Sequence, residues 1–145
     1  AQAQGFTQVL WLDAVERKYI EEVGSMNIFF VIDDEIVTPQ LNGTILPGIT
    51  RKSVLELARH WDLKTSERRI SIDEVLEGLE SGRVSEVFGA GTAAVISPVG
   101  LLHYRGQSSQ VGDGQTGPVA KRFFQHLTAI QYGRENDPFG WVETV

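Results

Sequence analysis

The 145-residue chain has the length and composition of one globular domain, with 41% hydrophobic and 22% charged residues. Its net charge of −6 argues against a nucleic-acid-binding surface, and without cysteine it has no disulfide, thiolate metal site or cysteine nucleophile. The longest apolar stretch, residues 92–102, is too short and too interrupted to cross a membrane. The lack of cysteine fits a reducing compartment, and we expect a cytoplasmic protein.

The first part of the chain is predicted to consist mainly of strands. Residues 7–12 form a buried strand, and a charged turn over 13–18 leads to an extended piece over 19–23. Residues 26–32 are rich in aromatic and β-branched side chains, which predicts a strand covered on both faces and paired in a hairpin with 35–38. Residues 1–4, followed by Gly5, resemble the last turn of a helix whose beginning is missing, or an expression-tag remnant.

The segment from Leu46 to Arg51 predicts a turn that leads into a helix. Pro47 and Gly48 favour a tight turn, and Thr50 is the expected N-cap of a helix that runs to about residue 61.

Two cations, Arg51 and Lys52, follow in the first turn of this helix, where the helix dipole favours acidic residues. Either both side chains point into solvent, or an anion occupies the helix start, bound by free N–H groups and the Thr50 hydroxyl.

The remainder of the chain mixes helices with strands. In chain order we predict a strand over 67–71, a helix from the capping box Ser71–Glu74 to Gly82, strands over 84–88 and 93–96, a hairpin of 101–104 with 108–111, and a helix from its cap at Thr116 to Gly133. The predicted core face of the last helix consists of Ala120, Phe123, Phe124, Leu127 and Ile130. Phe139 and Trp141 are expected to dock the tail. Strands and helices without regular alternation predict one mixed α/β (α+β) domain.

Two motifs do not indicate a ligand site. Gly112-x-Gly114-x-x-Gly117 has the spacing of a dinucleotide fingerprint, but no second strand follows the next helix, so a turn and a helix entry explain it better. His60, His103 and His126 lie in separate elements without ligand spacing, and we expect no metal site.

A longer signature spans the stretch from Glu22 to Arg51. It is carried by Glu22, Ser25, Asn27-Ile28-Phe29, Ile36-x-Thr38 and Leu46-Pro47-Gly48-Ile49-Thr50-Arg51. This pattern resembles that of the class IV (fold type IV) aminotransferases, and about thirty positions of mixed chemistry agree. The amino-acid sequences of segments 21–30, 88–93 and 131–135 resemble those of the branched-chain amino acid aminotransferases in particular.

The resemblance implies the C-terminal large domain of these enzymes, with strands curled into a barrel-like sheet and flanking helices. It implies pyridoxal 5'-phosphate (PLP) as cofactor, a homodimer, and ping-pong transamination between leucine, isoleucine or valine and 2-oxo acids such as 2-oxoglutarate. Alternatives within the fold are a D-amino acid aminotransferase and an aminodeoxychorismate lyase. The amino-acid sequence of residues 23–27 disfavours both. The alternative from another class is a non-catalytic domain that binds PLP or phosphate weakly.

The resemblance also assigns individual residues. Glu22 matches the carboxylate that faces the pyridine nitrogen and keeps it protonated, which strengthens the cofactor as an electron sink. The other matches to cofactor-binding positions are Ser25, Leu46, Gly48, Ile49, Thr50, Gly91 and Thr92, of which the helix-start turn and the second turn hold the phosphate. Backbone N–H groups at Thr92 and Ala93 match those that receive the substrate carboxylate.

The catalytic lysine of the family has no counterpart here. The family's Schiff-base lysine precedes this segment, and none of Lys18, Lys52, Lys64 and Lys121 matches its position. We therefore expect residues 1–145 to be a single domain, the C-terminal PLP-binding portion, with the N-terminal domain and the catalytic lysine outside it. The redox cysteines of mitochondrial relatives are replaced by Ala94 and Ser97, so no thiol switch is expected.

Overall fold

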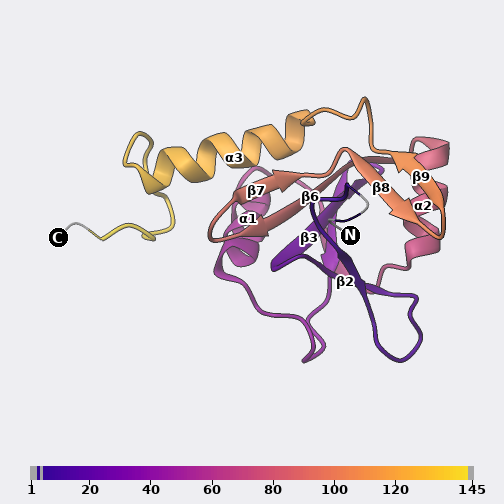
Figure 1. The fold of residues 1–145 in the computed structure, drawn as a ribbon. Helices are drawn as coiled ribbons and strands as arrows, with labels where there is room; N and C mark the ends of the chain where they lie inside the picture. The colour runs from indigo at the N-terminus through magenta and orange to yellow at the C-terminus, as the bar shows by residue number, and fades with distance from the viewer. Residues whose placement is uncertain (1–2, 4, 144–145) are drawn as a thin grey trace.

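The computed structural model describes residue 3 and residues 5–143, and the helical turn predicted over 1–4 lies, except for Ala3, outside these residues. The elements in chain order (Figure 1) are β1 (Leu10–Leu12), β2 (Ile20–Val23), β3 (Met26–Ile32), β4 (Glu35–Pro39), α1 (Ile49–His60), β5 (Thr65–Arg68), α2 (Ile72–Ser81), β6 (Val84–Gly91), β7 (Val95–Pro98), β8 (Leu101–Tyr104), β9 (Gln107–Gln110) and α3 (Pro118–Gln131).

Strand β3 is the centre of the sheet because strands pair with it along both edges. On one edge β6 runs antiparallel from the pair Asn27–Ala90 to the pair Ile32–Val84. The other edge is divided, since β2 pairs with the beginning of β3 and β4 with its end. All seven residues of β3 are buried, which confirms the prediction of a strand covered on both faces.

The seven-stranded sheet is completed by β1 on β2, β5 parallel to β4, and β7 on β6, while β8 and β9 form a separate hairpin. The mixed α/β fold is thereby confirmed. The barrel-like curl is not found as a closed structure, because the described strands form an open sheet whose path does not return to its first strand.

Both faces of the sheet are covered by helices. Alternate residues of β3 point to opposite faces, so Phe29 and Val31 pack with α1 and α3, whereas Ile28 and Phe30 pack with α2 and β8. Figure 1 shows α3 and α1 near β7 at one end of the molecule and α2 beside β9 at the other. None of the helices in the described residues is long and apolar enough to span a bilayer.

Two of the three predicted N-caps are wrong. Helix α1 begins at Ile49 with Gly48 as its N-cap, and α3 begins at Pro118 with Gly117 as its N-cap, so Thr50 and Thr116 do not have this role. In both helices the glycine next to proline already supplies the extended backbone that an N-cap needs.

Helix α2 begins and ends as predicted. The Ser71 hydroxyl accepts a hydrogen bond from the backbone N–H of Glu74 at 3.1 Å. Gly82 follows the helix in the left-handed conformation, with φ of 78°.

Packing departs from the prediction at two aromatic residues and agrees at the tail. Trp11 is 52% exposed, because β1 is a three-residue edge strand, and Phe124 of α3 is 45% exposed. The tail docks as expected. The Trp141 indole donates to Glu56 of α1 at 3.2 Å, and the Phe139 ring stacks on Trp141 at 4.2 Å between ring centroids.

Candidate functional site

A row of three side chains crosses the sheet on the face that α1 and α3 cover. Glu22 of β2 pairs with Asn27 of β3, which in turn pairs with Ala90 of β6. Directly paired residues of antiparallel strands present their side chains on the same face. Asn27 is only 5% exposed, and Glu22 is partly buried. The row lies at the end of the sheet where β3 begins and β6 ends, and we take it as the candidate site.

The backbone of Leu46 is held on this row from two sides. Its N–H donates to Glu22 Oε1 at 3.0 Å, and its carbonyl accepts from Asn27 Nδ2 at 2.8 Å. The N–H of Gly48 donates to the same carbonyl at 2.8 Å, which closes a tight turn around Pro47. The predicted ring-nitrogen carboxylate and the predicted phosphate turn therefore lie side by side.

The start of α1 presents free backbone donors. No side chain caps it, no acidic residue lies in its first turn, and its first intrahelical bond runs from Lys52 N–H to Gly48 O at 3.0 Å. The N–H groups of Ile49, Thr50 and Arg51 consequently have no partner within the helix. Three adjacent donors backed by the helix dipole form an arrangement that suits a phosphate or carboxylate group.

Neither of the two alternatives holds for both cations at this helix start, since Lys52 is exposed to solvent and Arg51 is buried. The Arg51 side chain is buried, and its Nη2 donates to the Pro39 carbonyl at 3.0 Å and to Glu67 Oε2 at 2.7 Å. Lys52 is exposed and lies 3.6 Å from Glu56 in an i,i+4 ion pair. Arg51 is therefore committed to an internal ion pair, and its charge gives no argument for a bound anion.

The second predicted turn lies at the same end of the sheet. A Cβ atom on Gly91 would lie 2.9 Å from Met26 Cγ, so the absence of a side chain lets Met26 pack against β6. Thr92 and Ala93 are exposed in the turn between β6 and β7, and Ser25 is exposed in the neighbouring turn between β2 and β3. Within the described residues, no hydrogen bond connects these two turns to Glu22 or to the start of α1.

No lysine ammonium group is hydrogen-bonded or ion-paired with Glu22, Leu46 or Thr50 in the part of the chain that the structure describes. Lys18 lines a cavity along α2, Lys52 pairs with Glu56, and Lys64 and Lys121 are exposed. Residues 5–143, together with residue 3, hold no cluster of three His, Asp or Glu side chains that fits a metal ion.

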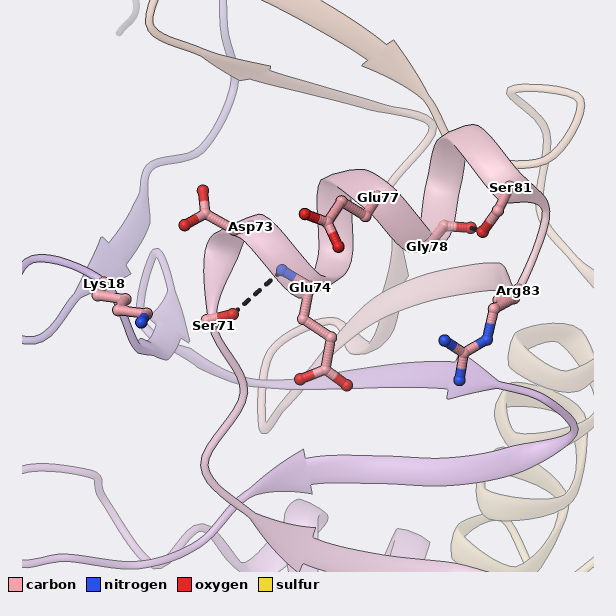
Figure 2. A pocket seen from close by; sticks show the side chains of 8 residues that line it. All are labelled: Lys18, Ser71, Asp73, Glu74, Glu77, Gly78, Ser81 and Arg83. Atoms are coloured by element: carbon pink, nitrogen blue, oxygen red, sulfur yellow. Dashed lines mark hydrogen bonds between the residues drawn. The ribbon is translucent and has the colours of Figure 1, made fainter.

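A cavity of about 500 Å³ lies along α2, away from the Glu22 row, and contains none of the predicted cofactor residues. Figure 2 shows the Asp73 and Glu77 carboxylates apart from that of Glu74, which points toward the strands below the helix. Glu74 is bonded to Arg68, and Arg83 is bonded to Asp33, where it holds the pKa of that carboxyl below its ordinary value. Glu74 and Arg83 are thus already ion-paired, and none of the predicted cofactor residues lines the cavity, so we assign the site to the Glu22 row.

Two side chains that shape the site were not predicted for it, namely Asn27 and Arg51. Each lies in the motif from Glu22 to Arg51, but neither was assigned a role. Asn27 could have been found from the pattern alone, because it is the single polar residue in the strand Met26–Ile32, and a buried amide needs a partner. The sequence marks Arg51 as a cation in the first turn of a helix, but that signal does not indicate its partners, Pro39 and Glu67, which are distant in sequence.

With this geometry known, comparison with other proteins identifies the family. The model of the family described as amino-transferase class IV matches residues 1–102. The chain belongs to the class IV aminotransferases. The predicted resemblance is thus confirmed. Over 145 residues the chain is 56% identical to Branched-chain-amino-acid aminotransferase 2 of Bacillus subtilis (strain 168), and over 137 residues it is 54% identical to a probable branched-chain-amino-acid aminotransferase of Staphylococcus aureus (strain N315).

Solved structures of branched-chain amino acid aminotransferases share the fold. The branched-chain amino acid aminotransferase from Escherichia coli matches with a TM-score of 0.82 at 35% identity, over 99% of this chain and 45% of that one. The T.th. branched-chain amino acid aminotransferase complexed with N-(5'-phosphopyridoxyl)-L-glutamate matches with a TM-score of 0.82 at 32% identity, over 99% of this chain and 44% of that one. The alignments cover 100% and 94% of this chain but only 40% and 38% of the Bacillus and Staphylococcus relatives.

Proposed function

We propose that this chain is the C-terminal, cofactor-binding part of a PLP-dependent branched-chain amino acid aminotransferase. The observation that carries the proposal is the 3.0 Å hydrogen bond from Leu46 N–H to the Glu22 carboxylate. It joins the acidic group expected at the pyridine nitrogen to the turn expected at the phosphate. The identity to branched-chain aminotransferases over the whole chain supports the same reading.

The chain's own groups fit this cofactor. Of the two carboxylate oxygens of Glu22, Oε1 accepts the Leu46 N–H, and Oε2 has no hydrogen-bond partner among the described residues. Oε2 is therefore available to a ring N–H. The free N–H groups of Ile49 and Thr50 suit the phosphate, and we assign to the same task Gly48, Thr50 Oγ1, Gly91 and Thr92. Leu46, 67% exposed beside Glu22, would contact the ring, and Ser25 would lie at the cofactor's edge. When bound, PLP withdraws electrons from the α-carbon of the amino acid.

In the reaction, the chain's residues would hold charges in place. The Glu22 carboxylate would keep a proton on the ring nitrogen, because a nearby negative charge favours the protonated form. N–H groups at Thr92 and Ala93 would bind the substrate carboxylate in an exposed, uncharged turn. None of Lys18, Lys52, Lys64 and Lys121 is bonded to the Glu22 row in the described part of the chain, and we assign the role of the base that moves the α-proton to a lysine outside residues 1–145.

The activity of the complete enzyme is part of the same proposal. We infer that it exchanges amino groups between leucine, isoleucine or valine and 2-oxoglutarate, as a cytoplasmic homodimer. An amino-donor panel on the full-length enzyme separates this activity from that of a D-amino acid aminotransferase or an aminodeoxychorismate lyase. Turnover with D-alanine or aminodeoxychorismate in place of L-leucine would contradict it, and sedimentation measures the dimer.

The binding role is tested on the chain itself. PLP is titrated into the wild type and into Glu22→Ala and Thr50→Ala, followed by its absorbance and by tryptophan fluorescence. The matched controls are Glu21→Ala, which removes the preceding carboxylate of the same strand, and Thr44→Ala, which removes the exposed threonine bonded to Glu21. We expect weak binding that Glu22→Ala and Thr50→Ala reduce and the two controls leave unchanged. Equal binding by Glu22→Ala and the wild type would contradict the assignment.

Covalent attachment is tested separately. After incubation with PLP and reduction with borohydride, the intact mass of the chain is expected to show no stoichiometric adduct. A single stoichiometric adduct at Lys18, Lys52, Lys64 or Lys121 would show that the catalytic lysine lies inside the chain, and the proposal for its location would be wrong.

A further inference from the structure

Asn27 occupies a position that apolar packing alone would not select. It is 5% exposed and lies in a strand whose other six residues are apolar. An unpaired buried amide is costly, whereas a paired one fixes the geometry of its partner. Its Nδ2 donates to the carbonyl of Leu46, nineteen residues away in sequence, at 2.8 Å.

The position of Asn27 in the sheet explains which partner it meets. It lies near the division between β2 and β4 on one edge of β3, and directly opposite Glu22. Glu22 and Asn27 therefore reach the backbone of Leu46 from neighbouring positions on one face of the sheet. Glu22 accepts a hydrogen bond from the Leu46 N–H, and Asn27 donates one to the Leu46 carbonyl.

Gly48 completes the contact. A Cβ atom built on Gly48 would lie 2.3 Å from Asn27 Oδ1, a distance that side chains do not tolerate. The amide of Asn27 thus touches both ends of the tight turn that precedes α1, because it bonds to Leu46 and lies against Gly48. Gly48 has a φ of −63°, so the need for glycine here comes from this close approach and not from the backbone conformation.

We propose that Asn27 is a positioning residue that holds the start of α1 at a fixed distance from the Glu22 carboxylate. The inference rests on the proposed function, since these are the groups assigned to the phosphate and the ring nitrogen. Asn27 itself need not contact the cofactor. A rigid ligand that must reach both groups binds only when the turn is in register with Glu22, so a turn that is correctly seated for one tenth of the time weakens binding tenfold.

The proposal predicts coupled effects at residues 27 and 48. Asn27→Ala removes the hydrogen bond to Leu46, and Gly48→Ala forces the turn away from the amide. Each change alone is expected to weaken PLP binding about tenfold, equivalent to about 1.4 kcal/mol. In the double variant the clash is absent, so Gly48→Ala should add less than about twofold to the effect of Asn27→Ala.

The matched control is Thr38→Val, because the Thr38 hydroxyl is buried near the same strand division and donates to Ile28 O at 2.6 Å without touching the turn. The first readout is hydrogen exchange, in the absence of PLP, of the three amides around the turn that have hydrogen-bond partners, namely those of Leu46, Gly48 and Lys52. We expect Asn27→Ala to speed exchange there about tenfold and Thr38→Val to leave it unchanged. The second readout is the Kd for PLP, and thermal melting verifies that each variant is folded.

The two readouts distinguish failure of this inference from failure of the proposed function. Unchanged exchange at Leu46, Gly48 and Lys52 in Asn27→Ala, or about hundredfold additive weakening in the double variant, would overturn the role of Asn27. Faster exchange confined to this turn supports it even if the wild-type chain binds no PLP, which would refute the proposed function alone. If Asn27→Ala does not fold, Gly48→Ala must still speed exchange in the turn, and its failure to do so overturns the proposal.

Discussion

Replacement of Arg51 by methionine tests whether the start of α1 is held by its buried guanidinium group. Methionine fills most of the volume of the arginine stem but donates no hydrogen bond. The substitution leaves the Pro39 carbonyl, now 3.0 Å from Arg51 Nη2, without its donor. It also removes one of two arginines from Glu67, whose carboxylate keeps Arg59 at 3.3 Å.

The expected loss is about 2 kcal/mol in the free energy of unfolding. An unsatisfied buried carbonyl costs about 1–3 kcal/mol. The lost ion pair adds less than about 1 kcal/mol, because the Glu67 side chain is 37% exposed and retains a partner. Removing the guanidinium also removes the free-energy cost of burying it, which offsets part of the loss. This cost exists because Arg51 Nε is buried without a partner among the described residues. The melting temperature should fall by about 4–8 °C.

The assay is urea unfolding followed by tryptophan fluorescence, with equal m-values required for the comparison. Arg59→Met is the matched control, because Arg59 lies in the same helix and bonds to the same Glu67 but has a side chain that is 56% exposed. We expect the control to lose less than about 0.5 kcal/mol. A loss of that small size for Arg51→Met as well would refute the argument that the buried guanidinium fixes this helix.

Substitutions at three further positions test other parts of the fold. Glu86→Ala should lower the free energy of unfolding by about 2 kcal/mol in a urea titration, because the buried carboxylate accepts the Val119 and Ala120 N–H groups at 2.9 Å each, and Glu86→Gln should lose less. Gly82→Ala should cost about 1 kcal/mol through its φ of 78° alone, since no atom lies within 4 Å of the added Cβ, and an unchanged melting temperature would contradict this. The backbone N–H groups of Tyr19, Lys18 and Glu16 lower the pKa of Asp13 from 3.8 to about 2. The stabilisation exists above pH 3.8 and is lost as the pH falls through about 2, so the wild type and Asp13→Asn should differ in melting temperature at pH 6 and converge below pH 2.

The elements with strong local signals were predicted from the sequence with nearly the right bounds. The strand Met26–Ile32 is apolar at every position but one, which is expected when both faces are covered. Asp33 and Asp34 both have positive φ, 48° and 64°, as the tight hairpin between β3 and β4 requires. Helix α2 has its start signal, Ser71, and its stop signal, Gly82, in the residues directly before and after it.

The error at Thr50 comes from a local turn, and the error at Arg51 comes from contacts that are distant in sequence. Thr50 has the residue type of an N-cap, but the backbone enters the helix two residues earlier, because Gly48 already lies in the tight turn bonded to Leu46. Arg51 resembled a free cation because its partners, Pro39 and Glu67, are brought to it only by the pairing of β4 with β5. Periodicity identified the face of a helix, but it could not identify an ion pair between segments.

The buried polar side chains explain how this fold keeps its loops and helix ends in register. In the part of the chain that the structure describes they are Asn27, Thr38, Arg51 and Glu86, and each bonds to the backbone of another segment. Apolar contacts stabilise the sheet and its helices but are non-directional, so they tolerate small sliding of a helix along the sheet. A buried hydrogen bond does not, because displacement leaves both partners unpaired. The start of α1 is fixed on one side by Asn27 through the Leu46 turn and on the other by Arg51, and the start of α3 is fixed by Glu86. A cofactor that bonds to a strand carboxylate and a helix start at once requires that fixed separation, which the apolar core alone does not provide.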